Sequence, residues 1–179
     1  MLYIVVNGNI MGRPGINKCR ANTVQMGLIE ILKPETVRVV GGFSSKKRLF
    51  QDIASIMGSV HGLDEGAVLS ELVDREGLCP TGVGRGIALP HARLDGLDHV
   101  MGCFLRLEKP LDFEAVDRQP VDLVFALFAP KDSGVAHLKA LASVSRTLKD
   151  ADICAKLRGN SDIAALFAIL TAEAESRAA

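Results

Sequence analysis

Apolar residues recur along the chain at two spacings, which predict alternating strands and helices from residue 26 onward. Three apolar runs predict strands, the β-branched run at residues 37–40 and the longer runs at residues 100–107 and 121–129. A fourth run, residues 87–89, is brief and ends at Pro90. Residues 121–129 are apolar at almost every position, which is typical of a central strand covered on both faces.

Longer segments carry apolar residues three and four positions apart and predict helices. The first begins after a serine cap, Ser44 or Ser45, and the second begins at Asp64. A third follows Ser133, and we expect it to turn these residues inward: Val135, Leu138, Leu141, Val144 and Leu148. Strands that alternate with helices predict the α/β class, with helices on the faces of a sheet.

Two shorter helices complete the pattern, one over residues 150–158 and one capped by Ser161. Before residue 26, Gly, Asn, Pro and Arg interrupt every period, and Met11 and Met26 are alternative translation starts. We expect three parts: a tail or misassigned start at residues 1–25, a single domain at residues 26–172 and a C-terminal tail at residues 173–179.

Composition narrows the function classes. The 179-residue chain carries 21 basic and 21 acidic residues and is 4% aromatic, which disfavours nucleic-acid binding, since that requires basic excess and stacking rings. No apolar run approaches the roughly 20 residues that cross a bilayer, so we expect no membrane insertion. The cysteines are far apart, without a Cys-x-x-Cys pair, which favours reduced thiols in a cytoplasmic protein: Cys19, Cys79, Cys103 and Cys154.

Two histidines occupy positions that the predicted topology could bring together. His91 follows Pro90 at the end of a strand, and His137 lies in the first turn of the helix after the central strand. Ligands gather beyond the carboxyl ends of strands in open α/β sheets, so both imidazoles could open into one crevice. The positive end of the helix dipole would also keep His137 neutral. Spacing alone leaves equally open that one ring packs in the core and the other lies on the surface.

Other motifs are less specific. The glycine-rich loop at residues 81–86 could present backbone N–H groups to a phosphate, but it fits neither a P-loop nor G-x-G-x-x-G, and a plain turn is favoured. Arg75 and Arg85 precede His91 in sequence and could neutralise a phosphoryl group, although surface arginines are common and spacing alone favours neither. No third ligand is spaced for a two-histidine metal site, which disfavours a metal-dependent hydrolase.

Three segments in the same order resemble the IIA domain of the bacterial phosphoenolpyruvate phosphotransferase system, of the fructose/mannitol type. They are REGLCPTGVGRGIALPH at residues 75–91, EKPLDFEAVDRQPVDLVFALFAP at residues 108–130 and HLKAL at residues 137–141. The similarity is greatest to the stand-alone nitrogen-regulatory members, which SSKKRLF at residues 44–50 also resembles. The resemblance spans roughly residues 26–167 and implies a mixed β-sheet flanked by helices on both faces, in a single domain.

The resemblance also implies roles for particular residues. His91 would accept the phosphoryl group, His137 would be the second active-site histidine, and Arg75 would steady the phosphate. Four residues would support the phosphate site: Thr81, Gly82, Gly84 and Gly86. The donor would be a small histidine phosphocarrier protein (HPr-like or NPr-like), itself charged from phosphoenolpyruvate by an enzyme I-type protein. Neither a metal nor an organic cofactor would be required.

This mechanism makes structural demands. His91 must be neutral, with one ring nitrogen free and the other donating to a backbone carbonyl. Leu94 and Leu97, in the polar loop expected after His91, are candidate docking residues for the donor, although ordinary packing into the domain is favoured for each of them. The phosphorylation state would regulate partners such as sensor kinases or transporters. Two alternatives stay open: a sugar-specific IIA that passes phosphate to a IIB, and a non-catalytic interaction module.

Overall fold

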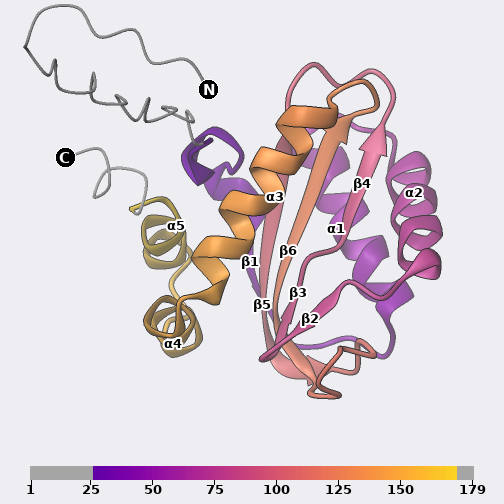
Figure 1. Ribbon diagram of the computed structural model, residues 1–179. Coiled ribbons are helices and arrows are strands. Elements are labelled where there is room, and N and C mark those ends of the chain that lie inside the picture. The colour runs from indigo at the N-terminus through magenta and orange to yellow at the C-terminus, as the bar shows by residue number, and fades with distance from the viewer. Residues whose placement is uncertain (1–25, 173–179) are drawn as a thin grey trace, which may run out of the picture.

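The computed structural model describes residues 26–172, so both expected tails, residues 1–25 and 173–179, lie outside the described residues. A mixed β-sheet occupies the middle of this part of the chain, with helices on both of its faces (Figure 1). The strands are β1 (Val37–Val40), β2 (Gly82–Gly84), β3 (Ile87–Ala88), β4 (His91–Leu94), β5 (Met101–Leu111) and β6 (Val121–Pro130). The α-helices are α1 (Lys46–His61), α2 (Glu65–Leu78), α3 (Gly134–Lys149), α4 (Ala151–Gly159) and α5 (Ile163–Thr171). Two 3-10 helices, η1 (Leu28–Glu30) and η2 (Pro34–Thr36), precede β1.

The sheet is mixed because β6 pairs with neighbours of both directions. The strand order is β1-β5-β6-β3-β2, and β4 also pairs with β6. β5 runs antiparallel to β6, whereas β3 and β4 run parallel to it. β3 lies against Leu123 and Val124, and β4 lies against the last four residues of β6, so the two short strands follow one path along β6 with a break at Leu89 and Pro90. The predicted fold class is therefore confirmed.

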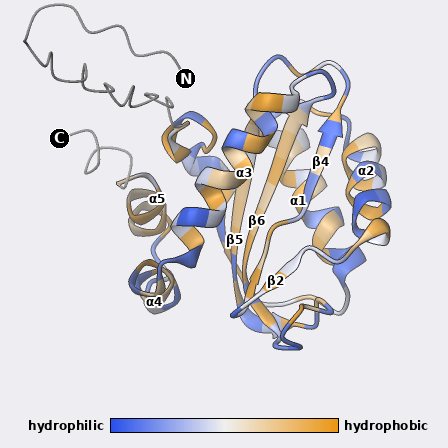
Figure 2. Ribbon diagram, viewed as in Figure 1, coloured by the Kyte–Doolittle hydropathy of each residue, from blue (hydrophilic) through white to orange (hydrophobic). Residues whose placement is uncertain are grey.

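The central position of β6, with helices on both faces of the sheet, explains why its sequence is almost continuously apolar. Alternate side chains point to opposite faces of a strand. Leu123, Phe125 and Leu127 pack on the face covered by η1, α3, α4 and α5. Val124, Ala126 and Phe128 pack on the face covered by α1 and α2. Figure 2 shows the strand as a hydrophobic band, whereas the surrounding helices mix hydrophobic and hydrophilic residues.

The prediction of a polar loop after His91 is wrong. Residues 91–94 form β4, which buries Ala92 and Leu94 against the α1–α2 core and exposes Arg93. Four residues next to a proline are too few for the alternation to stand out, and their pairing partners on β6 are 36 residues away in sequence. β5 also extends to Leu111, beyond the predicted end at residue 107.

At two helix starts the capping residue is the predicted one, and at a third the cap is shifted by one residue. The side chains of Ser45 and Asp64 cap α1 and α2, as predicted. Asp162 caps α5 in place of the expected Ser161, because its carboxylate accepts from the N–H groups of Ala164 and Ala165.

The prediction of which α3 residues face inward is wrong for the first turns of the helix. Val135 and Leu138 are 69% and 65% exposed, whereas Val144 and Leu148 are buried as expected. His137 and Ala140 take the inward positions at the start of the helix. Among residues 26–172, no helix is both long and apolar enough to span a membrane.

Candidate active site

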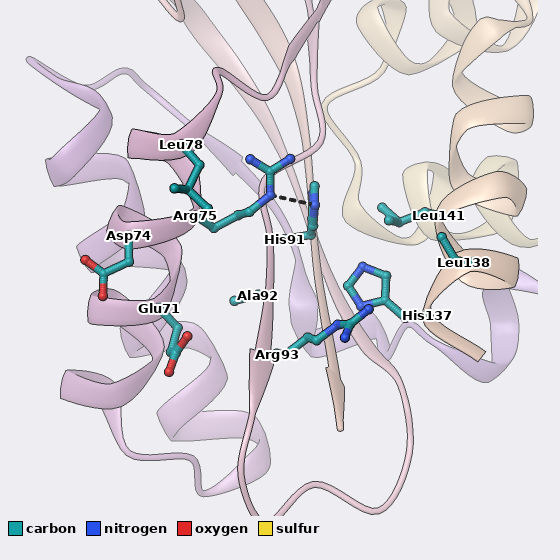
Figure 3. A pocket seen from close by; sticks show the side chains of 10 residues that line it. All are labelled: Glu71, Asp74, Arg75, Leu78, His91, Ala92, Arg93, His137, Leu138 and Leu141. Atoms are coloured by element: carbon teal, nitrogen blue, oxygen red, sulfur yellow. Dashed lines mark hydrogen bonds between the residues drawn. The ribbon is translucent and has the colours of Figure 1, made fainter. Parts of the chain in front are cut away.

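A cleft opens beside β4, between the C-terminal half of α2 and the first turns of α3 (Figure 3). Its volume is about 500 Å³. α2 contributes Glu71, Asp74, Arg75 and Leu78, β4 contributes His91, Ala92 and Arg93, and α3 contributes His137, Leu138 and Leu141. The two histidines meet here because β4 pairs with the carboxyl end of β6 and α3 begins just after that end.

The half-buried ring of His91 is held at both nitrogens. Its Nδ1 lies 2.9 Å from the carbonyl oxygen of Leu89, and its Nε2 lies 3.0 Å from Nε of Arg75. A carbonyl only accepts and a guanidinium only donates, so the proton is on Nδ1 and the lone pair is on Nε2. Burial lowers the pKa of His91, and the charges of Arg75 and Arg93 lower it further, while the Leu89 carbonyl opposes the shift. The ring is therefore neutral at pH 7.

Arg75 is itself oriented by the end of its helix. Its Nη1 donates to the carbonyl oxygen of Cys79 at 3.0 Å, directly after α2 ends. This bond and the bond to His91 fix the guanidinium across the cleft, as the dashed line in Figure 3 shows for the bond to His91.

His137 faces His91 across the cleft from α3. The ring centroids are 5.5 Å apart and the planes are at 80°, an edge-to-face arrangement. Only 4% of His137 is exposed, and its Nδ1 has no hydrogen-bond partner among the described residues. Burial lowers the pKa of His137 to about 4, and the neighbouring charges of His91, Arg93 and Arg75 act in the same direction. The ring is neutral, as predicted, but burial is the largest cause, not the helix dipole.

Arg93 is a residue of the cleft that the sequence pattern did not single out. It follows His91 by two positions on β4, so both side chains project from the same face of the strand. Figure 3 shows its guanidinium extending towards His137. The alternation within β4 could have found it, had that strand been predicted.

Thr81, Gly82, Gly84 and Gly86 lie outside the cleft. Gly84 and Gly86 have φ of 93° and 76°, values that favour glycine, and a Cβ on Gly82 would lie 2.8 Å from that of Ala115. The glycines thus serve the β2–β3 turn and its packing. Arg85 also points elsewhere, because its Nη1 donates to the carbonyl oxygen of Lys149.

Thr81 reaches His91 only indirectly. Its N–H and hydroxyl both donate to Oε2 of Glu76, and its carbonyl accepts from the N–H of Leu89. The carbonyl of Leu89 then holds His91.

The docking role predicted for Leu94 and Leu97 does not fit their positions. Leu94 is buried and Leu97 is half-buried, and both pack on the α1–α2 core. The exposed apolar residues at the cleft are Leu78, which is 83% exposed, and Leu138. No three His, Cys, Asp or Glu side chains within residues 26–172 are grouped so that they could hold a metal ion.

Comparison with known proteins identifies the family. The family model described as "Phosphoenolpyruvate-dependent sugar phosphotransferase system, EIIA 2" matches residues 30–173. The chain belongs to this EIIA family. It is 43% identical over 145 residues to the nitrogen regulatory protein of Bradyrhizobium diazoefficiens, covering 81% of this chain and 95% of the relative. It is 36% identical over 151 residues to that of Escherichia coli K12, covering 84% and 93%.

Solved structures of EIIA proteins have the same fold. The nitrogen regulatory protein IIA-Ntr from Neisseria meningitidis superposes with a TM-score of 0.75 at 34% identity, covering 80% of this chain and 99% of that one. The mannitol IIA of Escherichia coli superposes with a TM-score of 0.67 at 19% identity, covering 78% and 98%, which shows a shared fold. These relatives identify the chain as an EIIA of the nitrogen type, as the sequence resemblance predicted.

Proposed function

We propose that this EIIA protein is a histidine phosphocarrier that accepts a phosphoryl group on His91 from a phosphocarrier protein. Its phosphorylated and unphosphorylated forms would then regulate partner proteins in the cytoplasm, such as sensor kinases or transporters. One observation carries the proposal: the neutral ring of His91, with its proton held on Nδ1 by Leu89, presents the Nε2 lone pair beside Arg75 in an open cleft. A nucleophile for phosphoryl transfer needs this combination of an unprotonated nitrogen, a neutral ring and a nearby cation.

In the proposed step, the Nε2 lone pair of His91 attacks the phosphorus of a phosphohistidine on the donor. A bond forms between Nε2 and phosphorus while the bond between phosphorus and the donor nitrogen breaks, and that bond's electron pair returns to the donor ring. The donor ring loses its positive charge and the ring of His91 gains one, so no proton has to move. The Leu89 carbonyl keeps its hydrogen bond to Nδ1–H throughout.

Arg75, His137 and Arg93 supply charge and hydrogen bonds for the transferred group. The guanidinium of Arg75 must leave Nε2 for the phosphorus to approach, and its N–H groups are then free to donate to phosphoryl oxygens. His137 is neutral and can donate from one ring nitrogen, and Arg93 adds a second positive charge. Positioning and charge neutralisation of this kind provide most of the catalysis in phosphoryl transfer.

The cleft also has the surface that a protein donor requires. Leu78 and Leu138 lie exposed at it, on α2 and α3 respectively. The buried core of a protein–protein interface is more apolar than its rim, so exposed leucines on both sides of the reacting ring fit a docked donor. We assign the docking role to these two residues in place of Leu94 and Leu97.

The decisive test is phosphorylation in a purified system. The protein is incubated with phosphoenolpyruvate, enzyme I and a histidine phosphocarrier, and its intact mass is measured. We expect a gain of one phosphoryl group that is absent from His91→Ala and is lost on mild acid treatment, since phosphohistidine is acid-labile. No gain in mass, or an equal gain in His91→Ala, would refute the proposal and favour a non-catalytic interaction module.

A sugar-specific role is the second candidate. A relative from Haloferax volcanii, 39% identical over 106 residues, is named as a fructose-specific EIIA component. A deletion strain separates the two: the regulatory role predicts unchanged growth on fructose and mannitol, whereas a sugar-specific role predicts loss of growth on one of them.

A further inference from the structure

Glu76 is a buried carboxylate with no part in the phosphoryl transfer as described so far. It lies on α2 directly after Arg75, and only 9% of it is exposed. Its Oε1 accepts from Nζ of Lys46 at 3.1 Å. Its Oε2 accepts from Thr81 twice, from the N–H at 3.0 Å and from the hydroxyl at 2.6 Å. A buried carboxylate is costly unless its charge is paired and both oxygens are bonded, and Glu76 meets both conditions.

Hydrogen bonds connect this carboxylate to the Nδ1 side of His91. Thr81 accepts through its carbonyl from the N–H of Leu89 at 3.0 Å. Leu89 accepts through its own carbonyl from Nδ1–H of His91 at 2.9 Å. A shift of Thr81 would therefore move the backbone group that keeps the proton of His91 on Nδ1.

The same carboxylate fixes the Nε2 side. Its bonds to Thr81 tie the last turn of α2 to the segment that leads into β2. Arg75 lies on this turn and donates both to Nε2 of His91 and to the carbonyl of Cys79. The groups on the two ring nitrogens therefore depend on one buried side chain.

We propose that Glu76 is a positioning residue for His91, which holds Arg75 and the Leu89 carbonyl in register on opposite sides of the ring. This inference rests on the function proposed above and assigns part of the machinery that prepares the acceptor.

The charge of Glu76 contributes as well. Burial lowers the pKa of His91, whereas the Leu89 carbonyl and the negative charge of Glu76 oppose that shift. Glu76 thus favours the positively charged ring that forms when Nε2 bonds to phosphorus.

The first variant is Glu76→Gln. Lys46 and Thr81 donate to different oxygens of Glu76, and an amide replaces one of these oxygens with a donor NH₂, so Gln loses one of the two partners. We expect the rate of phosphorylation at saturating phosphocarrier to fall about tenfold or more, and KM for the phosphocarrier to change by less than about twofold.

The matched control is Glu114→Gln. Oε2 of Glu114 also accepts from Lys46, at 2.6 Å, but Glu114 is exposed and no hydrogen bond joins it to Thr81. This variant removes one of the two carboxylates of Lys46 and leaves the connection to His91 intact. Its phosphorylation rate should stay within about twofold of the wild type.

The tautomer of His91 gives a readout that stability alone would not move. Nitrogen-15 NMR of the unphosphorylated protein should show the proton on Nδ1 in the wild type and Glu114→Gln, and a mixture of tautomers in Glu76→Gln. Thr81→Val removes the hydroxyl bond and should shift both rate and tautomer in the same direction, while Thr81→Ser restores them. If Glu76→Gln does not fold, the comparison of Thr81→Val with Thr81→Ser tests the positioning role of Glu76 instead.

Two failures can be told apart. Wild-type rates and an unchanged Nδ1–H tautomer in Glu76→Gln and Thr81→Val would overturn the positioning role. A wild-type protein that accepts no phosphoryl group would overturn the proposed function instead, and the tautomer measurements would still decide what Glu76 does.

Discussion

The centre of the sheet and the cleft beside β4 are built on opposite principles. In the centre, residues 123–129 of β6 are apolar and fully buried, and their side chains divide between two cores. In the cleft, the ring of His137 is buried although its Nδ1 has no hydrogen-bond partner among the described residues. Burying an unpartnered polar group reduces stability, and the apolar centre must offset this cost. The difference indicates that stability and chemistry reside in separate parts of one sheet.

The sharpest contrast is Phe125→Ala against His91→Ala. Phe125 is fully buried on β6, with its ring centroid 6.4 Å from that of Phe104. Its truncation should lower the free energy of unfolding by about 3–5 kcal/mol. His91→Ala should cost about 1 kcal/mol or less while abolishing phosphorylation. Urea unfolding measures both, and an equal loss of stability in the two variants would contradict the separation.

Lowering the pH should lower the free energy of unfolding, because the ring of His137 is buried in its neutral form. The pKa of His137 is about 4 in the folded protein against 6.5 for an ordinary histidine, so the unfolded chain takes up a proton first as pH falls. Stability is therefore lost between about pH 6.5 and pH 4, by on the order of 3 kcal/mol from this residue. Urea unfolding of the wild type and His137→Gln across this range should show the difference between them changing by that amount. A constant difference would contradict the buried neutral ring.

Adding a methyl group at a glycine tests how tightly the centre of the sheet is packed. A Cβ on Gly102 of β5 would lie 2.8 Å from Ile31 and 2.9 Å from Phe125. Gly102→Ala should therefore lower the free energy of unfolding by about 1–3 kcal/mol. Gly134→Ala is the control, because nothing lies within 4 Å of its Cβ, and it should change stability by about 0.5 kcal/mol or less.

The smallest expected effect lies at the rim of the cleft. Arg93 is exposed, and its charge lowers the pKa of both His91 and His137. Arg93→Gln should raise both pKa values in an NMR titration and change the free energy of unfolding by about 0.5 kcal/mol or less. Unchanged pKa values of His91 and His137 would show that the charge of Arg93 does not affect the two rings.

The sheet's centre was the most predictable region. Residues 121–129 identify a strand buried on both faces, and Ser45 and Asp64 mark helix starts through local capping bonds. β4 was missed because its four residues become a strand only through pairing with β6. The pattern predicts Leu138 to face inward because an exposed apolar residue can have the same helical spacing as a core residue.

The site was only partly predictable. Topology suggested that His91 and His137 could meet, but their roles and that of Arg75 came from resemblance to a family. Glu76 gave no signal, because its partner Lys46 is thirty residues away and a glutamate in a helix usually faces solvent.

In the proposed transfer, Nε2 of His91 carries the phosphoryl group while Nδ1 keeps its proton. Phosphorus-31 and nitrogen-15 NMR of the phosphorylated protein, labelled on its histidines, tests this directly. We expect phosphorus coupled to Nε2 of His91 and a proton still bound to Nδ1. Phosphorus coupled to Nδ1 of His91, or to either nitrogen of His137, would contradict it.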